Sequence, residues 1–254
     1  MEQVVLKEVR EGIHYIRLNR PGRLNAMDMS LLEGLLQALQ GAEREGVGVV
    51  AITGEGRAFS AGADLVEFRA AEDPFSVVHQ LAGVLHQVIA QVRRMSPLVV
   101  ALVNGPAVGA GFSLSLACDL AIASEEAYFD MAYMRIALSP DGGGSLSLPR
   151  IIGLKRAMEV FLLTEPIAAR EAKELGLVNY VFPPERLYEE AHKLLLRFLA
   201  LPRRTVMALK ELVNESLFPD LEAHLVRERT LIAEMAAEEE FRRRVEAFFR
   251  KRAG

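Results

Sequence analysis

The chain has 254 residues, of which 51% are hydrophobic, and its formal net charge is -4 with acidic and basic residues mixed along most of its length. This composition suits one large or two small globular domains with a substantial core. It lacks the strong positive field that holds a nucleic-acid backbone, so a nucleic-acid partner is disfavoured.

A single cysteine, Cys118, excludes an internal disulfide and a multi-cysteine metal site, and we interpret it as a small core residue. The N-terminus has neither a basic start nor an apolar signal core. No stretch is apolar for the ~18 residues that a membrane span needs. We therefore expect a cytoplasmic protein without a membrane partner.

Short apolar runs alternate with longer amphipathic ones, which is typical of a layered α/β protein. Strands are predicted as a hairpin over 4–9 and 14–18, then over 47–53, 98–103, 120–123 and 178–182. Helices are predicted over 31–43, 74–94, 112–118, 146–163 with a start near Pro149, and 168–175. Charged helices follow over 185–199, 203–217 and 221–250. The sequence thus predicts a mixed core over 1–182 and a helical region over 183–254, which we expect to serve oligomerisation and pocket closure.

The last predicted helix carries an apolar stripe among many arginines. A stripe of this kind with a basic rim suits packing against the core or another subunit, and it also suits a phosphate-bearing ligand. We favour packing, because such stripes are more often structural. Its residues are Phe241, Val245, Phe248 and Phe249.

Two loops of small residues each follow a predicted buried strand. They are residues 59–64, Phe-Ser-Ala-Gly-Ala-Asp, and residues 104–111, Asn-Gly-Pro-Ala-Val-Gly-Ala-Gly. Small residues let the main chain approach a ligand, and N–H groups at a helix start favour negative charge. Two such loops would make an oxyanion hole, although each alone also suits a plain turn. Neither matches a phosphate loop or a dinucleotide fingerprint.

A third loop of small residues, 139–144, holds Asp141. This is the one acidic residue between Asp130 and Glu159. The Pro-Asp-Gly order suits a turn, and an Asp ahead of a helix caps it. The residues alone leave two interpretations open, a turn residue or a lone carboxylate that faces a pocket built from backbone.

Four motifs follow one another along the chain: Leu-Asn-Arg-Pro-Gly-Arg-Leu-Asn-Ala at 18–26, Gly-Arg-Ala-Phe-Ser-Ala-Gly-Ala-Asp-Leu at 56–65, the segment 97–119, and Glu-Ala-Lys-Glu-Leu-Gly-Leu-Val at 171–178. Together they resemble the enoyl-CoA hydratase/isomerase (crotonase) superfamily. The resemblance implies a crotonase-like spiral of repeated β-β-α units with a C-terminal helical trimerisation region, assembled as a homotrimer or a dimer of trimers. It also implies an acyl-CoA substrate that brings its own coenzyme A, with no metal or redox cofactor.

The resemblance also assigns roles by position. The thioester oxygen is held by two main-chain N–H groups, which here belong to Ala63 and Ala110. Removal of one such donor costs about 3 kcal/mol of transition-state stabilisation. Asp64 is expected to anchor its own loop. The expected substrate-binding residues are Arg23, Ala26, Ala61, Asp64, Leu65, Gly109, Ser113, Tyr133 and Lys251.

The resemblance departs from the hydratases at two positions. Relatives that hydrate double bonds carry two glutamates, where this chain has Ser113 and Tyr133. Asp141 falls where ring-epoxide acyl-CoA isomerases of phenylacetate breakdown, some 3,2-enoyl-CoA isomerases and aryl-CoA dehalogenases keep a carboxylate. We therefore predict an enoyl-CoA isomerase that shifts a double bond by proton transfer through Asp141.

Other activities stay open. Aryl-CoA dehalogenases add a His and a Trp, but here Tyr133 lies near the Trp position and His86 only near the His position. His79 and His86, seven residues apart on one predicted helical face, are interpreted as surface or packing residues. An enoyl-CoA hydratase and a non-catalytic acyl-CoA or RNA binder are further alternatives.

Overall fold

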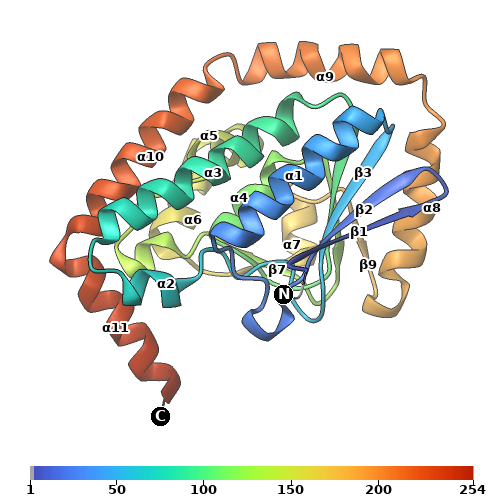
Figure 1. Ribbon diagram of the computed structural model, residues 1–254. Coiled ribbons are helices and arrows are strands. Elements are labelled where there is room, and N and C mark those ends of the chain that lie inside the picture. The colour runs from blue at the N-terminus through green and yellow to red at the C-terminus, as the bar shows by residue number, and fades with distance from the viewer. Residues whose placement is uncertain (1–2, 254) are drawn as a thin grey trace.

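The computed structural model describes residues 3–253, which form an α/β protein with two sheets and a surround of helices (Figure 1). The predicted regions 1–182 and 183–254 also include residues 1, 2 and 254, which lie outside this range. No described helix is long and apolar enough to cross a membrane.

The large sheet lies at the centre of the molecule. Its first two strands form the predicted antiparallel hairpin, and all later pairings are parallel. The central strands are almost wholly buried, as expected for parallel strands with helices on both sides. In spatial order the strands are β1 (Val5–Arg10), β2 (Ile13–Leu18), β3 (Val49–Gly54), β4 (Leu98–Val103), β6 (Leu120–Ser124) and β9 (Tyr180–Phe182).

A small second sheet was not predicted. Its strands have only two or three residues, which is too short to show an alternating pattern. In spatial order they are β5 (Ala107–Val108), β7 (Tyr128–Asp130) and β8 (Ile167–Ala168).

Helices cover both faces of the large sheet. Two of them, α1 (Met29–Glu45) and α3 (Pro74–Arg94), pack on one face, and α8 (Leu187–Leu199) packs on the other (Figure 1). The side chain of Asp28 caps α1 by accepting from the N–H of Leu31 at 2.8 Å. The other helices are α2 (Leu65–Ala70), α4 (Ala110–Ala117), α5 (Gly144–Ile152), α6 (Leu154–Leu163), α7 (Ala169–Glu174), α9 (Arg203–Leu217), α10 (Leu221–Ala237) and α11 (Glu239–Ala253), with 3-10 turns at Pro21–Arg23, Tyr133–Ile136 and Pro184–Arg186.

Two predicted helices are wrong because each is divided in the structure. The segment 146–163 breaks at Gly153, whose φ of 79° no helix allows, and 221–250 breaks at Glu238, which is extended. Pro149 lies inside α5 and not near its start. The helix begins earlier because Gly142 and Gly143 both take positive φ values immediately ahead of it.

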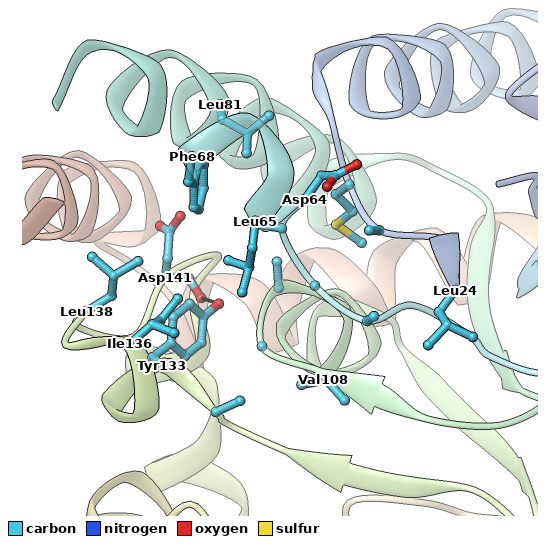
Figure 2. A pocket seen from close by; sticks show the side chains of 18 of the residues that line it. Leu24, Asp64, Leu65, Phe68, Leu81, Val108, Tyr133, Ile136, Leu138 and Asp141 are labelled. Atoms are coloured by element: carbon cyan, nitrogen blue, oxygen red, sulfur yellow. Dashed lines mark hydrogen bonds between the residues drawn. The ribbon is translucent and has the colours of Figure 1, made fainter. Parts of the chain in front are cut away.

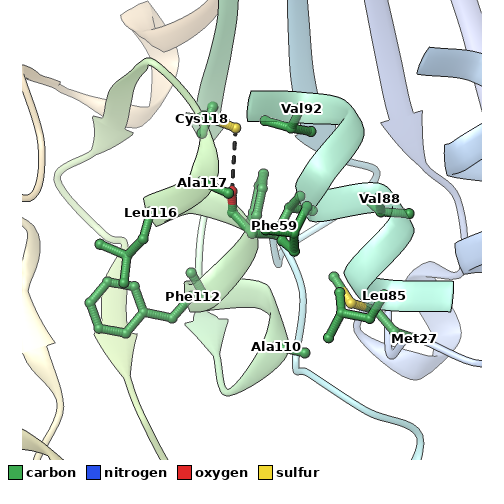
Figure 3. Packing of buried hydrophobic residues seen from close by; sticks show 14 of the residues in the cluster. Met27, Phe59, Leu85, Val88, Val92, Ala110, Phe112, Leu116, Ala117 and Cys118 are labelled. Atoms are coloured by element: carbon green, nitrogen blue, oxygen red, sulfur yellow. Dashed lines mark hydrogen bonds between the residues drawn. The ribbon is translucent and has the colours of Figure 1, made fainter. Parts of the chain in front are cut away.

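The helix α4 is buried along its whole length and packs beside α3 (Figure 3). Phe112 has no exposed surface and stacks in a tilted contact on Phe129. Cys118 is buried after the helix end, its thiol donates to the carbonyl of Leu114, and burial raises the pKa of that thiol. The prediction of Cys118 as a core residue is confirmed.

Candidate active site

A cavity of about 720 Å³ lies where the first two glycine loops meet α2, α3 and the C-terminal helices. Three arginines line its mouth, and each is exposed: Arg23, Arg57 and Arg135. Farther in, the wall is apolar, and the carboxylate of Asp141 lies near Phe68 and Leu138 (Figure 2). The cavity lining therefore combines exposed arginines with many apolar side chains, and the Asp141 carboxylate lies among the apolar ones.

The first two loops are joined through their main chains. Ser60 donates from its N–H to the carbonyl of Pro106 at 3.1 Å and accepts from the N–H of Val108 at 2.9 Å. A Cβ atom on Gly111 would lie 2.6 Å from the carbonyl oxygen of Ser60, so only glycine fits there. This close approach places both loops on one wall of the cavity.

Two main-chain N–H groups on this wall have no acceptor among residues 3–253: those of Ala63 and Ala110. Ala110 is the first residue of α4, where an N–H has no partner within the helix. A Cβ atom on Gly62 would lie 3.4 Å from the nitrogen of Ala110, so the two donors come from segments in contact. The geometry suits binding of one oxygen by both.

Asp141 lines the cavity although it is only 4% exposed. Its carboxylate is hydrogen-bonded to Nε2 of His86 on α3. Its main-chain oxygen accepts from the hydroxyl of Ser113 at 2.7 Å and from that of Tyr133 at 3.2 Å. Asp141 is therefore both the turn residue and the pocket carboxylate that the sequence left as alternatives.

Tyr133 lines the cavity, whereas Ser113 lies behind it. Burial, and next the negative charge of Asp141, raise the pKa of the Tyr133 phenol well above its usual 10.0. The phenol therefore stays neutral and can donate. Both residues support Asp141 rather than standing as independent acids.

Two other carboxylates line the cavity, and each is paired with an arginine. Asp64 caps α2 and bonds to Arg20 at 3.0 Å, in agreement with its expected role as a loop anchor. Asp130 is 2.7 Å from Nη1 of Arg135. Among the described lining residues, Asp141 is thus the carboxylate that has no arginine partner.

The remaining predicted site residues divide into two groups. Lys251 is exposed on α11 and does not line the cavity of this chain. Of the aromatic stripe, Phe241 and Val245 are buried in the core, whereas Phe248 and Phe249 line the cavity. The residues that do line it as predicted are Arg23, Ala26, Ala61, Leu65 and Gly109.

Sequence reasoning missed two residues beside Asp141. His86, interpreted above as a surface or packing residue, is buried against the carboxylate, and Glu228 on α10 is buried nearby. The spacing of 55 residues between His86 and Asp141 gives no local signal. Helix α10 carries many charged residues, so the sequence does not distinguish the buried Glu228 from the exposed acidic residues around it.

Comparisons with known proteins agree over almost the whole chain. Residues 8–254 match the enoyl-CoA hydratase/isomerase family. The 1,2-epoxyphenylacetyl-CoA isomerase of Escherichia coli (strain K12) is 33% identical over 258 residues, covering 100% of this chain and 98% of that protein. A 4-chlorobenzoyl coenzyme A dehalogenase-2 of an Arthrobacter species is 37% identical over 219 residues, covering 85% and 79%. The crystal structure of an enoyl-CoA hydratase from Mycobacterium avium subsp. paratuberculosis K-10 superposes with a TM-score of 0.89 at 30% identity, covering 97% and 99%.

The fold is accordingly the α/β crotonase-like fold. The chain belongs to the enoyl-CoA hydratase/isomerase family, whose members act on acyl-CoA substrates. Names of hydratases, isomerases and dehalogenases all occur among the similar proteins.

Proposed function

We propose that the protein is an enoyl-CoA isomerase in which Asp141 moves a proton between two carbons of the acyl group. One observation carries this proposal: among the described residues that line the cavity, Asp141 is the carboxylate without an arginine partner. It shares the cavity with the N–H groups of Ala63 and Ala110, which have no acceptor among residues 3–253. Those two donors stabilise the negative charge that forms on the thioester oxygen.

The proposed step needs one base. Asp141 takes a proton from the carbon between the thioester and the double bond of a 3-enoyl-CoA, and the electrons move onto the thioester oxygen as a dienolate. Asp141 then returns the proton to the far carbon of the dienolate, so that the double bond lies next to the thioester. Atoms and charge balance without water, metal or redox cofactor, and coenzyme A leaves with the product.

His86 fits this mechanism because it holds one carboxylate oxygen. Its Nε2 bonds to Oδ1 of Asp141, which leaves Oδ2 without a hydrogen-bond partner among residues 3–253. The bond fixes the plane of the carboxylate, so Oδ2 can meet the substrate carbon in one orientation. The apolar residues around Asp141 exclude water that would compete for the proton.

Hydration is disfavoured because it needs a second acid or base to activate water. Ser113 and Tyr133 stand at the two positions where the hydratases carry glutamates, and both donate to the main chain of Asp141. Glu228 is a further carboxylate close to Asp141, but it does not line the cavity. No described carboxylate other than Asp141 is placed to hold a water at the inner end.

The lining also indicates the class of acyl group. Arginines are the cations among the described lining residues, and all three are exposed. Arg135 is paired with Asp130, which leaves Arg23 and Arg57 to suit the phosphates of coenzyme A. The inner wall is apolar, with contributions from Leu81, Leu85, Leu138 and Ile232. We infer an uncharged acyl group, since a terminal carboxylate would find no cation there.

We further propose the assembly and location expected from the sequence. Exposed apolar residues on α6 and α9 support a homotrimer or a dimer of trimers. Lys251 is exposed. We propose that it contacts the phosphates of a CoA ligand bound to a neighbouring subunit. A cytoplasmic location is part of the same proposal.

The proposal is tested with a straight-chain 3-enoyl-CoA and its 2-enoyl isomer. We expect the wild type to interconvert them, and we expect Asp141→Asn to lower kcat by about 10²–10⁴-fold, the usual contribution of a general acid or base. Binding of coenzyme A by calorimetry is the control and should be unchanged. Rapid hydration of the 2-enoyl-CoA by both proteins would refute the isomerase.

A second candidate is dehalogenation of an aryl-CoA, favoured by one observation. His86 contacts Asp141, which the sequence did not resolve, and a similar protein is named a 4-chlorobenzoyl coenzyme A dehalogenase. In this reaction Asp141 would attack the ring carbon that bears the halogen, halide would leave, and water would cleave the aryl ester to restore the carboxylate. In the resemblance Tyr133 lies near the position where those relatives keep a tryptophan, so we rank dehalogenation second.

Chloride release separates the two candidates. The wild type is incubated with 4-chlorobenzoyl-CoA, and free chloride is measured beside the isomerase assay. Chloride release that Asp141→Asn abolishes would establish the second candidate, because Asp141 is the group that attacks the ring. If the protein is an isomerase, we expect no release of chloride.

A further inference from the structure

Glu228 is a buried carboxylate outside the cavity wall. It is 4% exposed, and it lies on α10, far from Asp141 in the chain. It accepts from the N–H of Gly143 at 2.7 Å, from the N–H of Ser145 at 3.2 Å and from the Ser145 hydroxyl. Burial of a charge is costly unless donors satisfy it, and these three donors do so.

Those donors belong to the segment that presents Asp141. Gly142 and Gly143 follow Asp141 directly with φ values of 64° and 73°, and α5 begins at Gly144. N–H groups at the start of a helix lack partners within it and attract an anion. Glu228 therefore holds the turn that carries Asp141 without itself lining the cavity.

The same face of α10 meets two other parts of the site. The helix packs along α3, which carries His86, and Ile232, one turn beyond Glu228, lines the cavity. One ligand atom each from His86, Asp141 and Glu228 lie within 4.8 Å of one another. In this arrangement Glu228 accepts three hydrogen bonds and Asp141 bonds to His86.

We propose that Glu228 is a positioning residue that fixes the Asp141 turn against the His86 helix. This inference rests on the proposed function, because it assigns Glu228 a role through Asp141. A displacement of about 1 Å can lower a rate by about 10²-fold, so loss of the anchor acts on the chemical step. Coenzyme A binding at the mouth is not affected.

The test compares Glu228→Ala, Glu228→Gln and the control Glu222→Gln. Glu222 lies on the same helix in an exposed ion pair with Arg94. We expect Glu228→Ala to lower kcat for the 3-enoyl-CoA by about 10²-fold with an unchanged KM, and Glu228→Gln to restore part of it, because its amide oxygen still accepts. Glu222→Gln should match the wild type.

Hydrogen exchange of the peptide that spans 139–148 gives a second readout that needs no substrate. We expect faster exchange in Glu228→Ala than in the wild type, because the N–H groups of Gly143 and Ser145 lose their acceptor. If Glu228→Ala does not fold, the test depends on Glu228→Gln, for which we expect a smaller loss of kcat.

The outcomes separate the two proposals. A wild type that is inactive on the enoyl-CoA refutes the isomerase, while the exchange data still decide whether Glu228 anchors the turn. An active wild type with an unchanged kcat in the folded Glu228 variants refutes the positioning role. A fall of kcat in Glu222→Gln equal to that in Glu228→Gln would refute it too.

Discussion

At the scale of single residues, Tyr133 supports the Asp141 turn through its hydroxyl. The ring is buried, and the hydroxyl lies 3.2 Å from the main-chain oxygen of Asp141 and 3.3 Å from the hydroxyl of Ser113. Ser113 also donates to the same oxygen, so the turn has two donors. Loss of one leaves that oxygen with a partner.

We expect Tyr133→Phe to lower the free energy of unfolding by about 1 kcal/mol at neutral pH, the net value of one hydrogen bond. Burial raises the pKa of Tyr133, so above the ordinary tyrosine pKa the unfolded chain loses a proton that the folded chain keeps. The stability is complete below about pH 10 and falls as the pH rises toward and through the folded pKa.

Urea unfolding between about pH 8 and about pH 11 measures this slope. The wild type should lose stability with rising pH more steeply than Tyr133→Phe. Tyr15, whose pKa burial also raises, contributes equally to both proteins. Equal slopes would show that Tyr133 ionises as freely in the folded protein as in the unfolded one.

The sequence indicated the site residues that local patterns mark and missed those that only the fold brings in. The glycine loops after strands suggested an oxyanion hole, and the family resemblance assigned its donors to Ala63 and Ala110. Asp141 is conspicuous as an isolated acid. His86 and Glu228 reach Asp141 from α3 and α10, and neither has a neighbour in the sequence that reveals this. Contacts over such separations depend on helix packing, which periodicity does not specify.

At the scale of elements, the Asp141 turn contains a glycine, Gly142, whose surroundings are crowded for a side chain. A Cβ atom on Gly142 would lie 3.0 Å from Cβ of Ser113 and 3.2 Å from a methyl group of Leu85. Gly46, the C-cap of α1, has a similar φ of 66°, but its nearest neighbour is the end of the flexible Arg203 side chain at 3.4 Å. Alanine at Gly46 therefore tests backbone strain alone, whereas alanine at Gly142 tests strain together with crowding.

We expect Gly46→Ala to cost about 1–2 kcal/mol, the price of a left-handed conformation, with unchanged kcat. Gly142→Ala should cost more and also lower kcat, because Ser113 or the Asp141 turn must move. Urea unfolding and isomerase kinetics on both variants check this. Equal effects on stability and activity would mean that crowding at Gly142 is relieved without moving Asp141.

Elements with a strong pattern and clear ends were predicted almost to the residue. The strand 98–103 and the helix 74–94 agree with β4 and α3, because a buried apolar run and a Pro at the helix start define them. The break at Gly153 was missed because the apolar spacing continues across it. The short strands β5, β7 and β8 exist through pairing with one another, which no local pattern shows.

At the scale of the whole molecule, the C-terminal helices α9, α10 and α11 run around the outside of the core (Figure 1). The inner face of α10 packs on α3 and anchors the Asp141 turn. Their outer surface, with that of α6, remains apolar in places. Leu154, Met158 and Leu162 follow one another at four-residue spacing on α6, and they are 64%, 45% and 57% exposed. Such a row on one helical face is typical of a subunit interface.

We expect light scattering after gel filtration to give the mass of a trimer or a hexamer for the wild type. The double variant Leu154→Glu, Leu162→Glu should shift the mass toward the monomer, because it places two charges in an apolar contact that would have to lose their water. Val9→Glu is the matched control, since Val9 is equally exposed, at 61%, but stands alone on the edge strand β1. A monomeric wild type would refute the proposed assembly.

A double variant that keeps the wild-type mass would show that the α6 row is not the interface. The interface would then lie on the other exposed apolar helix, α9, where Leu209 and Leu212 are 60% and 64% exposed.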